Sequence, residues 1–358
     1  MSAFRSGRVT SVLSERRGLQ RVEVDLGAGS ERAYVLPQLT GSVSRGDRVV
    51  VNTTAVDLGL GTGGWHFVHW NLERSEWNEP GPGHILKARY TSLQADVGST
   101  EEHLSADQSA VTSIDGMPVV AAALHSQLPA VAVTIRALRP DARIAYVMTD
   151  GAALPLALSD LVAELQACTI IDATITCGHA FGGDYEAVNV FSALAIARHV
   201  AHADVAIVVM GPGIVGTNST LGFTGIEVGS VLDATHGLGG QPIACVRASN
   251  ADGRERHRGV SHHTITTLTV ATQSRVTVAL PMVEPRVDVE LRAELEAAGI
   301  TARHDVLTRP IPDVLELFAA HDLHVTSMGR PAAGDPILFQ CAAAAGAQSV
   351  ISLGERIT

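Results

Sequence analysis

The stretch DVAIVVMGPGIVGTNST, residues 204–220, decides the fold class. Its first part, Asp204–Met210, is an almost unbroken apolar run, which is typical of a strand buried on both faces of a parallel sheet. Glycine and hydroxyl side chains follow from Gly211 to Thr220 and mark a loop after that strand. The residues beyond the loop predict a helix near 223–236. The order strand, loop, helix is the building unit of an α/β fold.

The same alternation of apolar runs and helical stretches extends outward over residues 118–358. We predict further strands at 119–124, 143–149, 170–176, 242–247, 275–281 and 323–327. Further helices are predicted at 126–138, 153–167, 185–202, 261–271, 287–298, 312–320 and 335–346. Continuous apolar strands separated by helices indicate a mostly parallel, doubly wound, Rossmann-like sheet with helices on both faces. Its crossovers should be right-handed.

Residues 1–75 have a different pattern. Polar and apolar residues alternate in Gly7–Leu13 and Arg21–Leu26, and turn residues separate these runs from later short ones. This spacing predicts a small all-β, barrel-like module. We predict that the polar segment 76–117 connects it to an α/β domain over 118–358. The connection should be partly ordered, because long structureless loops are uncommon in compact domains.

Composition excludes several function classes. The chain has 358 residues, a net charge of −11 and a pI near 5.7, which argues against a general nucleic-acid binder. Its one lysine, Lys87, follows no glycine-rich loop, so an ordinary P-loop nucleotidase is excluded. The 4 cysteines form no C-x-x-C pair, which indicates a reducing, cytoplasmic setting. We predict no secretory signal and no membrane-spanning helix.

The loop after the 204–210 strand is the best candidate for binding a ligand, because open parallel sheets bind ligands beyond the carboxyl ends of their strands. Its glycines let the backbone approach a ligand, and the following helix N-terminus favours an anion. A phosphate or a carboxylate fits this chemistry. The alternative is an ordinary turn capped by a serine or threonine. The predicted ligand-binding residues here are Gly211, Gly213, Gly216, Thr217, Asn218, Ser219 and Thr220.

The segment 254–263 is the second candidate, with three arginines and three histidines. Arg256 and Arg258 could hold an anion, since guanidinium groups bind phosphate and carboxylate with two hydrogen bonds. Histidines can bind metal or transfer protons. Because adjacent helical residues point about 100° apart, we expect His262 and His263 not to share a metal easily, whereas His257 could pair with either. The spacing matches no standard zinc motif. The alternative is a solvated basic loop in which Ser261 caps a helix.

Two further strand ends carry polar side chains. His179 follows the 170–176 strand and is a candidate for proton transfer. Asp184 could orient it, bind a cation or cap the next helix, and Asp150 could be a helix cap or a general base. Arg330 and Asp335 could complete the same rim. The predicted catalytic residues are therefore His179, His257, His262 and His263. A divalent metal is left open, with candidate ligands His257, His263 and Asp184.

The segment Gly59–Gly64 formally matches the dinucleotide pattern G-x-G-x-x-G. A β-type segment follows it, whereas the fingerprint must open a helix. We interpret it as a glycine turn, with a close backbone approach to a ligand as the alternative. No nucleotide cofactor is predicted.

The motifs GPGIVGT (211–217), GFTGIE (222–227) and RHRGVSHHT (256–264) resemble an uncharacterised bacterial family, a domain of unknown function common in Actinobacteria and Firmicutes. The resemblance extends over most of the chain and includes LGTGG (60–64) and MGR (328–330). It implies a bacterial cytoplasmic protein and implies no activity.

The sequence therefore predicts a cytoplasmic protein that binds a small anionic metabolite, such as a phosphorylated one, at the strand ends. Group transfer or hydrolysis suits the candidate residues best. The alternative is a non-catalytic small-ligand sensor or scaffold. A nucleic-acid-associated protein is the least favoured reading because of the charge balance. No membrane partner is expected, and homo-oligomer formation is left open.

Overall fold

The computed structural model describes residues 2–60, 62–283 and 285–354. The chain forms two compact units, Met1–Gly98 and Ser99–Thr358. The boundary between them falls inside the segment 76–117, which was predicted to connect two domains. Each unit has its own buried core.

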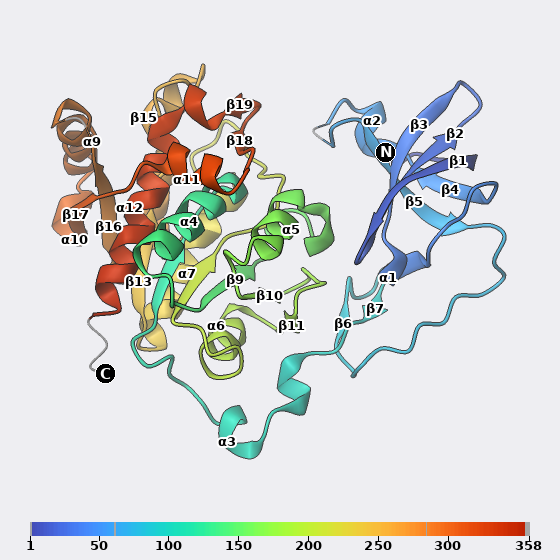
Figure 1. Cartoon of the computed structure of the whole chain (residues 1–358), viewed down its shortest axis with the longest axis horizontal. Helices are drawn as coiled ribbons and strands as arrows, with labels where there is room; N and C mark the ends of the chain where they lie inside the picture. The colour runs from blue at the N-terminus through green and yellow to red at the C-terminus, as the bar shows by residue number, and fades with distance from the viewer. Residues whose placement is uncertain (1, 61, 284, 355–358) are drawn as a thin grey trace. The chain divides into compact units, whose positions relative to one another are not determined.

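The first unit contains a closed five-stranded barrel, drawn in blue in Figure 1. Its strands follow the order β1-β2-β3-β5-β4, in which β3 and β5 are parallel. Side chains alternate between the two faces of each strand, so that Val22 and Val24 of β2 are buried inside. The predicted barrel-like module is confirmed. The strands are β1 (Phe4–Arg16), β2 (Leu19–Asp25), β3 (Ser30–Val35), β4 (Arg48–Asn52) and β5 (Trp65–Asn71).

The glycine segment 59–64 is followed by β5 and not by a helix. This agrees with its interpretation as a glycine turn, because the dinucleotide fingerprint must open a helix. Gly61 lies outside the described residues. The rest of this unit contains short elements: α1 (Pro37–Thr40), α2 (Thr54–Asp57) and the pair β6 (Leu86–Lys87) and β7 (Ala95–Asp96).

The second unit is built on an eight-stranded sheet in which every strand pair is parallel. The strand order is β11-β10-β9-β12-β8-β13-β16-β17. The strands are β8 (Pro118–Ala121), β9 (Ile144–Met148), β10 (Ala173–Thr176), β11 (Tyr185–Glu186), β12 (Val205–Val208), β13 (Gln241–Cys245), β16 (Thr277–Met282) and β17 (Asp305–Pro310).

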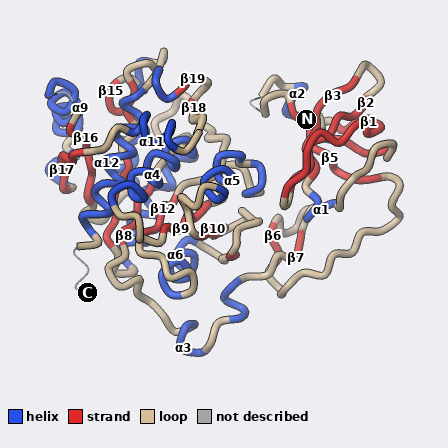
Figure 2. The backbone as a smooth tube through the Cα atoms, viewed as in Figure 1, coloured by secondary structure: helices blue, strands red, loops and turns tan. Residues whose placement is uncertain are grey.

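Helices cover both faces of this sheet (Figure 2). Along β9, Ile144 and Tyr146 face one core, whereas Ala145 and Val147 face the other. This double burial explains why the strands read as continuous apolar runs, and it confirms the predicted doubly wound α/β fold. One core contains α4 (Leu128–Leu138), α5 (Asp160–Ala167), α11 (Val314–Ala320) and much of α12 (Pro336–Ser352). The other contains α6 (Val190–His199), α7 (Val228–Gly237) and α9 (Pro285–Ala297).

Several predicted boundaries are wrong. The helix predicted over 185–202 begins only at Val190, because Tyr185–Glu186 pairs with the sheet edge as β11 and Asn189 caps the helix through its side chain. The helix predicted over 153–167 begins at Asp160, after its cap Ser159. The edge strand β17 was not predicted, because its half-exposed residues lack a continuous apolar run.

Several short elements lie at the carboxyl ends of the strands. They are the 3-10 turn Thr224–Glu227, the hairpin β14 (Ala248–Ser249) and β15 (Gly259–Val260), α8 (His262–Thr266) with the π-turn Thr267–Ala271, and the hairpin β18 (Thr326–Ser327) and β19 (Arg330–Pro331). The helices α3 (Ala106–Ser109) and α10 (Ile300–Arg303) complete the unit. Within the described residues, no helix combines the length and apolar character needed to cross a membrane.

Candidate functional site

The two loops predicted to bind an anion lie together at the strand ends. Arg256 Nη1 donates a hydrogen bond to Asn218 Oδ1 at 2.8 Å. The ring of His263 stacks on Phe223, with centroids 3.8 Å apart and planes 4° apart. These loops follow β12 and β13, which flank β8 in the sheet. The arrangement therefore occupies the edge at which open α/β sheets bind ligands.

The loop between β14 and β15 folds through side-chain turns. Ser249 Oγ accepts hydrogen bonds from the backbone N–H groups of Ala251 (3.2 Å) and Asp252 (2.9 Å). Asp252 Oδ1 in turn accepts from the Arg254 N–H at 3.0 Å. Such turns are typical of serine and aspartate. They turn the Asp252 carboxylate inward, where the residue is buried.

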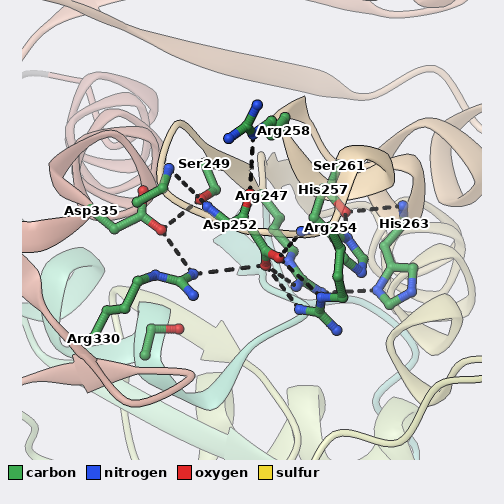
Figure 3. A network of polar contacts seen from close by, with 12 residues as sticks. Arg247, Ser249, Asp252, Arg254, His257, Arg258, Ser261, His263, Arg330 and Asp335 are labelled. Carbon is green, nitrogen blue, oxygen red and sulfur yellow. Dashed lines mark hydrogen bonds and ion pairs between the residues drawn. The ribbon is translucent and has the colours of Figure 1, made fainter.

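Asp252 is the centre of a charge network (Figure 3). Arg254 donates to both of its carboxylate oxygens, at 3.0 and 2.8 Å. Nitrogens of Arg247 and Arg330 lie 3.9 and 3.7 Å from Oδ2. Arg330 also bonds to Asp335, which accepts a hydrogen bond from Ser249 Oγ at 2.6 Å. The hydrogen bond from Arg254 holds the pKa of Asp252 well below its usual range, so the carboxylate is ionised.

Positive charge exceeds negative charge in this network. The guanidinium groups belong to Arg247, Arg254, Arg256, Arg258 and Arg330, and the carboxylates to Asp252 and Asp335. Arg256 and Arg258 bond to neutral oxygens, namely the Asn218 amide and the Asp252 backbone carbonyl. Arg247 is buried, and burial together with the charge of Arg254 lowers its pKa to about 10. We call this network, together with His257, His262 and His263, the arginine–histidine cluster. Its guanidinium groups can donate hydrogen bonds to an anion.

The three histidines converge from two elements. His257 ends the 3-10 turn Glu255–His257, and His262 and His263 open α8. The ring centroids lie 5.0 Å apart for His257 and His262 and 4.8 Å apart for His257 and His263. The rings of His262 and His263 lie only 4.4 Å apart. The structure thus corrects the expectation that sequence adjacency separates these two rings, because side-chain torsions bring together rings that start from diverging Cβ positions.

Hydrogen bonds fix two of these rings. His257 Nδ1 lies 2.7 Å from Ser261 Oγ, which also caps α8 by accepting the His263 N–H, as predicted for Ser261. Arg247 Nη1 donates to His263 Nδ1 at 3.0 Å. Burial, assisted by the charge of Arg247, lowers the pKa of both His257 and His263 to about 3. Both rings are therefore neutral at pH 7.

The loop 211–220 uses much of its polarity internally. Thr217 Oγ1 and Ser219 Oγ lie 2.9 Å apart, and the Thr217 N–H donates to the Gly222 carbonyl at 2.7 Å. Gly216 forms a β-bridge with Phe223, which closes the loop into a hairpin. Asn218 is the residue that reaches the second loop, whereas Thr220 is simply exposed.

The glycines of this loop have different reasons to be glycine. A Cβ at Gly211 would lie 2.7 Å from the Ala153 carbonyl oxygen, so close packing explains that position. Gly213 has a φ of 103°, which other residues rarely adopt. A Cβ at Gly216 would lie 3.6 Å from His263 Cε1, so this glycine borders the histidines.

The helix after this loop does not present a free N-terminus. The 3-10 turn Thr224–Glu227 precedes α7, and Glu227 occupies the N-cap position. Its carboxylate accepts a hydrogen bond from Thr149 Oγ1. Burial raises the pKa of Glu227 to about 7, and the nearby Asp150 adds to the rise. An anion at this helix end would meet the carboxyl group of Glu227. The arginines are therefore better placed to donate hydrogen bonds to an anion.

His179 and Asp184 lie at a different part of the sheet edge. Asp150 Oδ2 accepts the His179 N–H at 2.9 Å, and Asp184 Oδ2 accepts the Thr174 N–H at 3.0 Å. They follow β10, which β9, β12 and β8 separate from β13, a distance of roughly 20 Å at normal strand spacing. The structure does not bring them to His257 and His263, and Asn189, not Asp184, caps α6.

Sequence reasoning missed three residues of this edge. The sequence pattern predicts Arg247 as the last residue of the 242–247 strand, although a charged residue at the end of an apolar run indicates a site residue. The sequence pattern does not identify Asp252, whose pairing with Arg254 depends on a local side-chain turn. Glu227 lay inside a predicted helix, and nothing in its local pattern indicated burial.

The chain belongs to the family described as "Protein of unknown function (DUF3866)", whose model matches residues 32–346. The match begins in β3 and ends in α12, so it includes the whole arginine–histidine cluster. It confirms the resemblance to a family of unknown function. No curated protein matches the chain.

Proposed function

We propose that the arginine–histidine cluster binds a small anionic metabolite through a phosphate or carboxylate group, and that the protein is an enzyme of group transfer or hydrolysis. One observation carries the proposal. Arg247 is buried, its guanidinium group bonds to the neutral ring of His263, and its nearest carboxylate oxygen lies 3.9 Å away on Asp252. A buried charge is costly unless it is paired and hydrogen-bonded. An anion among the arginines would give Arg247 a closer charged partner than Asp252.

The histidines supply the chemistry in this proposal. Neutral imidazole can accept a proton or coordinate a metal at pH 7, and both actions assist hydrolysis and group transfer. His257, His262 and His263 lie beside the arginines that would hold the anion. Charge neutralisation and activation would therefore occur in one place.

Thermal unfolding with added anions tests the binding step. The panel contains inorganic phosphate, pyrophosphate, citrate and phosphorylated metabolites. An anion at a hundred times its Kd should stabilise the protein by about 2.7 kcal/mol. Arg256→Gln should weaken binding about tenfold or more, because it removes a charged donor. The matched control is Arg275→Gln, an exposed arginine paired with Asp305 just before β16, at the opposite sheet edge.

Two outcomes would contradict the proposal: no anion raises the unfolding temperature, or Arg275→Gln weakens binding as much as Arg256→Gln. Turnover separates an enzyme from a sensor. An enzyme should lose turnover in His263→Ala and keep measurable anion binding. A ligand that binds tightly without being converted would make the protein a sensor.

We propose a bacterial cytoplasmic location. All four cysteines lie in the described part of the chain, and none is in a disulfide, which suits a reducing compartment. Fractionation of the native cells with an antibody to the chain would test it.

A further inference from the structure

We infer that His257, His262 and His263 form a binding site for a transition-metal ion such as Zn²⁺, and that the anion of the proposed function completes its coordination. The second half of this inference rests on the proposed function, whereas the first half stands without it. The ligand atoms of the three rings all lie within 4.8 Å of one another. Three histidines and one open position are the ligand set of a catalytic zinc site.

The ring nitrogens are prepared for such a role. His262 Nε2 is buried and has no hydrogen-bond partner among the described residues. An unpaired buried nitrogen costs free energy that a metal bond would recover. His257 Nδ1 is held by Ser261 Oγ, which leaves its Nε2 for a metal. A hydrogen bond at the second ring nitrogen is typical of histidine ligands, because it fixes the tautomer and the ring orientation.

His263 requires one rearrangement. Arg247 now donates to its Nδ1, so the neutral ring carries its proton on Nε2. Metal binding at Nε2 moves that proton to Nδ1, and Arg247 must then release the ring. Asp252 Oδ2 lies 3.9 Å from Arg247 Nη2 and is ionised, so it can accept the guanidinium group. Metal binding should therefore free Arg247 from the ring, so that its several N–H groups can bond to Asp252 and to the anion.

Distance and charge set the remaining requirements. A tetrahedral ion with metal–nitrogen bonds of about 2.0 Å places its ligand nitrogens roughly 3.3 Å apart, so the rings must move closer by side-chain rotation. The ion adds positive charge near Arg247, Arg254 and Arg256, and an anionic ligand offsets that charge. Metal and anion should consequently strengthen each other's binding by the same factor.

Metal titration of the full chain tests the site directly. Co²⁺ is added to chelator-treated protein without other anions, and binding is followed by calorimetry and by the visible absorption of the ion. We expect one Co²⁺ per chain with the spectrum of a tetrahedral or five-coordinate site. His262→Gln should weaken binding at least about tenfold. His236→Gln, which removes an exposed histidine in the last turn of α7, should bind as the wild type does.

Circular dichroism of metal-free His262→Gln shows whether this variant folds. If it does not, the wild-type stoichiometry and spectrum still decide. No bound ion, an octahedral spectrum, or equal affinity in folded His262→Gln overturns the metal site. Anion stabilisation without metal binding overturns this inference alone. Metal binding without any anion response leaves the metal site standing and overturns the proposed function.

Discussion

Arg247 connects the charges of the cluster to its histidines. It lies two residues after Cys245, where β13 ends, and contacts both His263 and Asp252. The sequence predicts Arg256, His257 and their neighbours as site residues, because polar residues that follow a predicted strand can be recognised in the sequence. It could not identify Arg247 as a site residue, because that role depends on the hairpin β14–β15 folding back over the strand end.

Removing the Asp252 carboxylate should expose the charge imbalance. We expect Asp252→Asn to lower the free energy of unfolding by about 3 kcal/mol or more, since it leaves buried Arg247 without an ionised neighbour. The control is Asp305→Asn, which breaks the exposed pair with Arg275 and should cost about 1 kcal/mol or less. Urea unfolding measures both. Equal losses would show that Asp252 is an ordinary surface partner.

The half-buried His125 should make stability depend on pH. Its ring contacts the Met210 carbonyl and Ser159 Oγ, and burial lowers its pKa to about 4. The unfolded chain takes up this proton near pH 6.5, so stability is complete above that pH and falls as the pH drops from about 6.5 to 4. His125→Gln should flatten this slope by up to about 1.4 kcal/mol per pH unit. Urea midpoints at pH 7.5, 5.5 and 4.5 provide the measurement, and an unchanged slope would refute the assignment.

The elements at the strand ends were harder to predict than the strands. Apolar runs predict the sheet, because strands buried on both faces are apolar along their whole length. The hairpin β14–β15 and the closed loop 216–223 have no such sequence pattern, since side-chain turns and long-range contacts determine them. The start of the helix predicted over 185–202 is wrong for the same reason: Tyr185–Glu186 is a strand because β10 lies beside it, and the helix begins at Val190.

The hairpin depends on one glycine. Gly259 has a φ of 60°, and a Cβ there would lie 2.3 Å from Glu294 Oε1, whose carboxylate accepts the Val260 N–H. Gly259→Ala should therefore cost about 1–3 kcal/mol in unfolding free energy and weaken anion binding, because the arginine loop must shift. Gly253→Ala in the same loop is the control, since a Cβ there meets nothing within 4 Å. We expect it to change stability by less than about 0.5 kcal/mol. Similar losses in both variants would exclude this role of Glu294.

At the scale of the whole molecule, the net charge of −11 conceals an uneven distribution. Residues 1–98 hold 11 basic and 10 acidic side chains, so the acidic excess belongs to the second unit. The arginine–histidine cluster is a local basic region within that acidic unit. Because net charge is a sum over the whole chain, it does not show a local cluster of basic side chains.

The second unit should fold and bind the anion without the barrel. It has two cores of its own and contains every residue of the arginine–histidine cluster. We expect residues 99–358 to fold alone and to bind the anion with an affinity within about threefold of the full chain. Calorimetric titration of both proteins makes the comparison. A folded fragment that has lost binding would assign part of the ligand contact to the barrel unit.

A crystal structure of the full chain grown with inorganic pyrophosphate tests the central claim most directly. The account predicts the anion within hydrogen-bonding distance of Arg247 and Arg256, beside the rings of His257 and His263. Pyrophosphate bound only elsewhere, with the cluster left as it is without ligand, would contradict it.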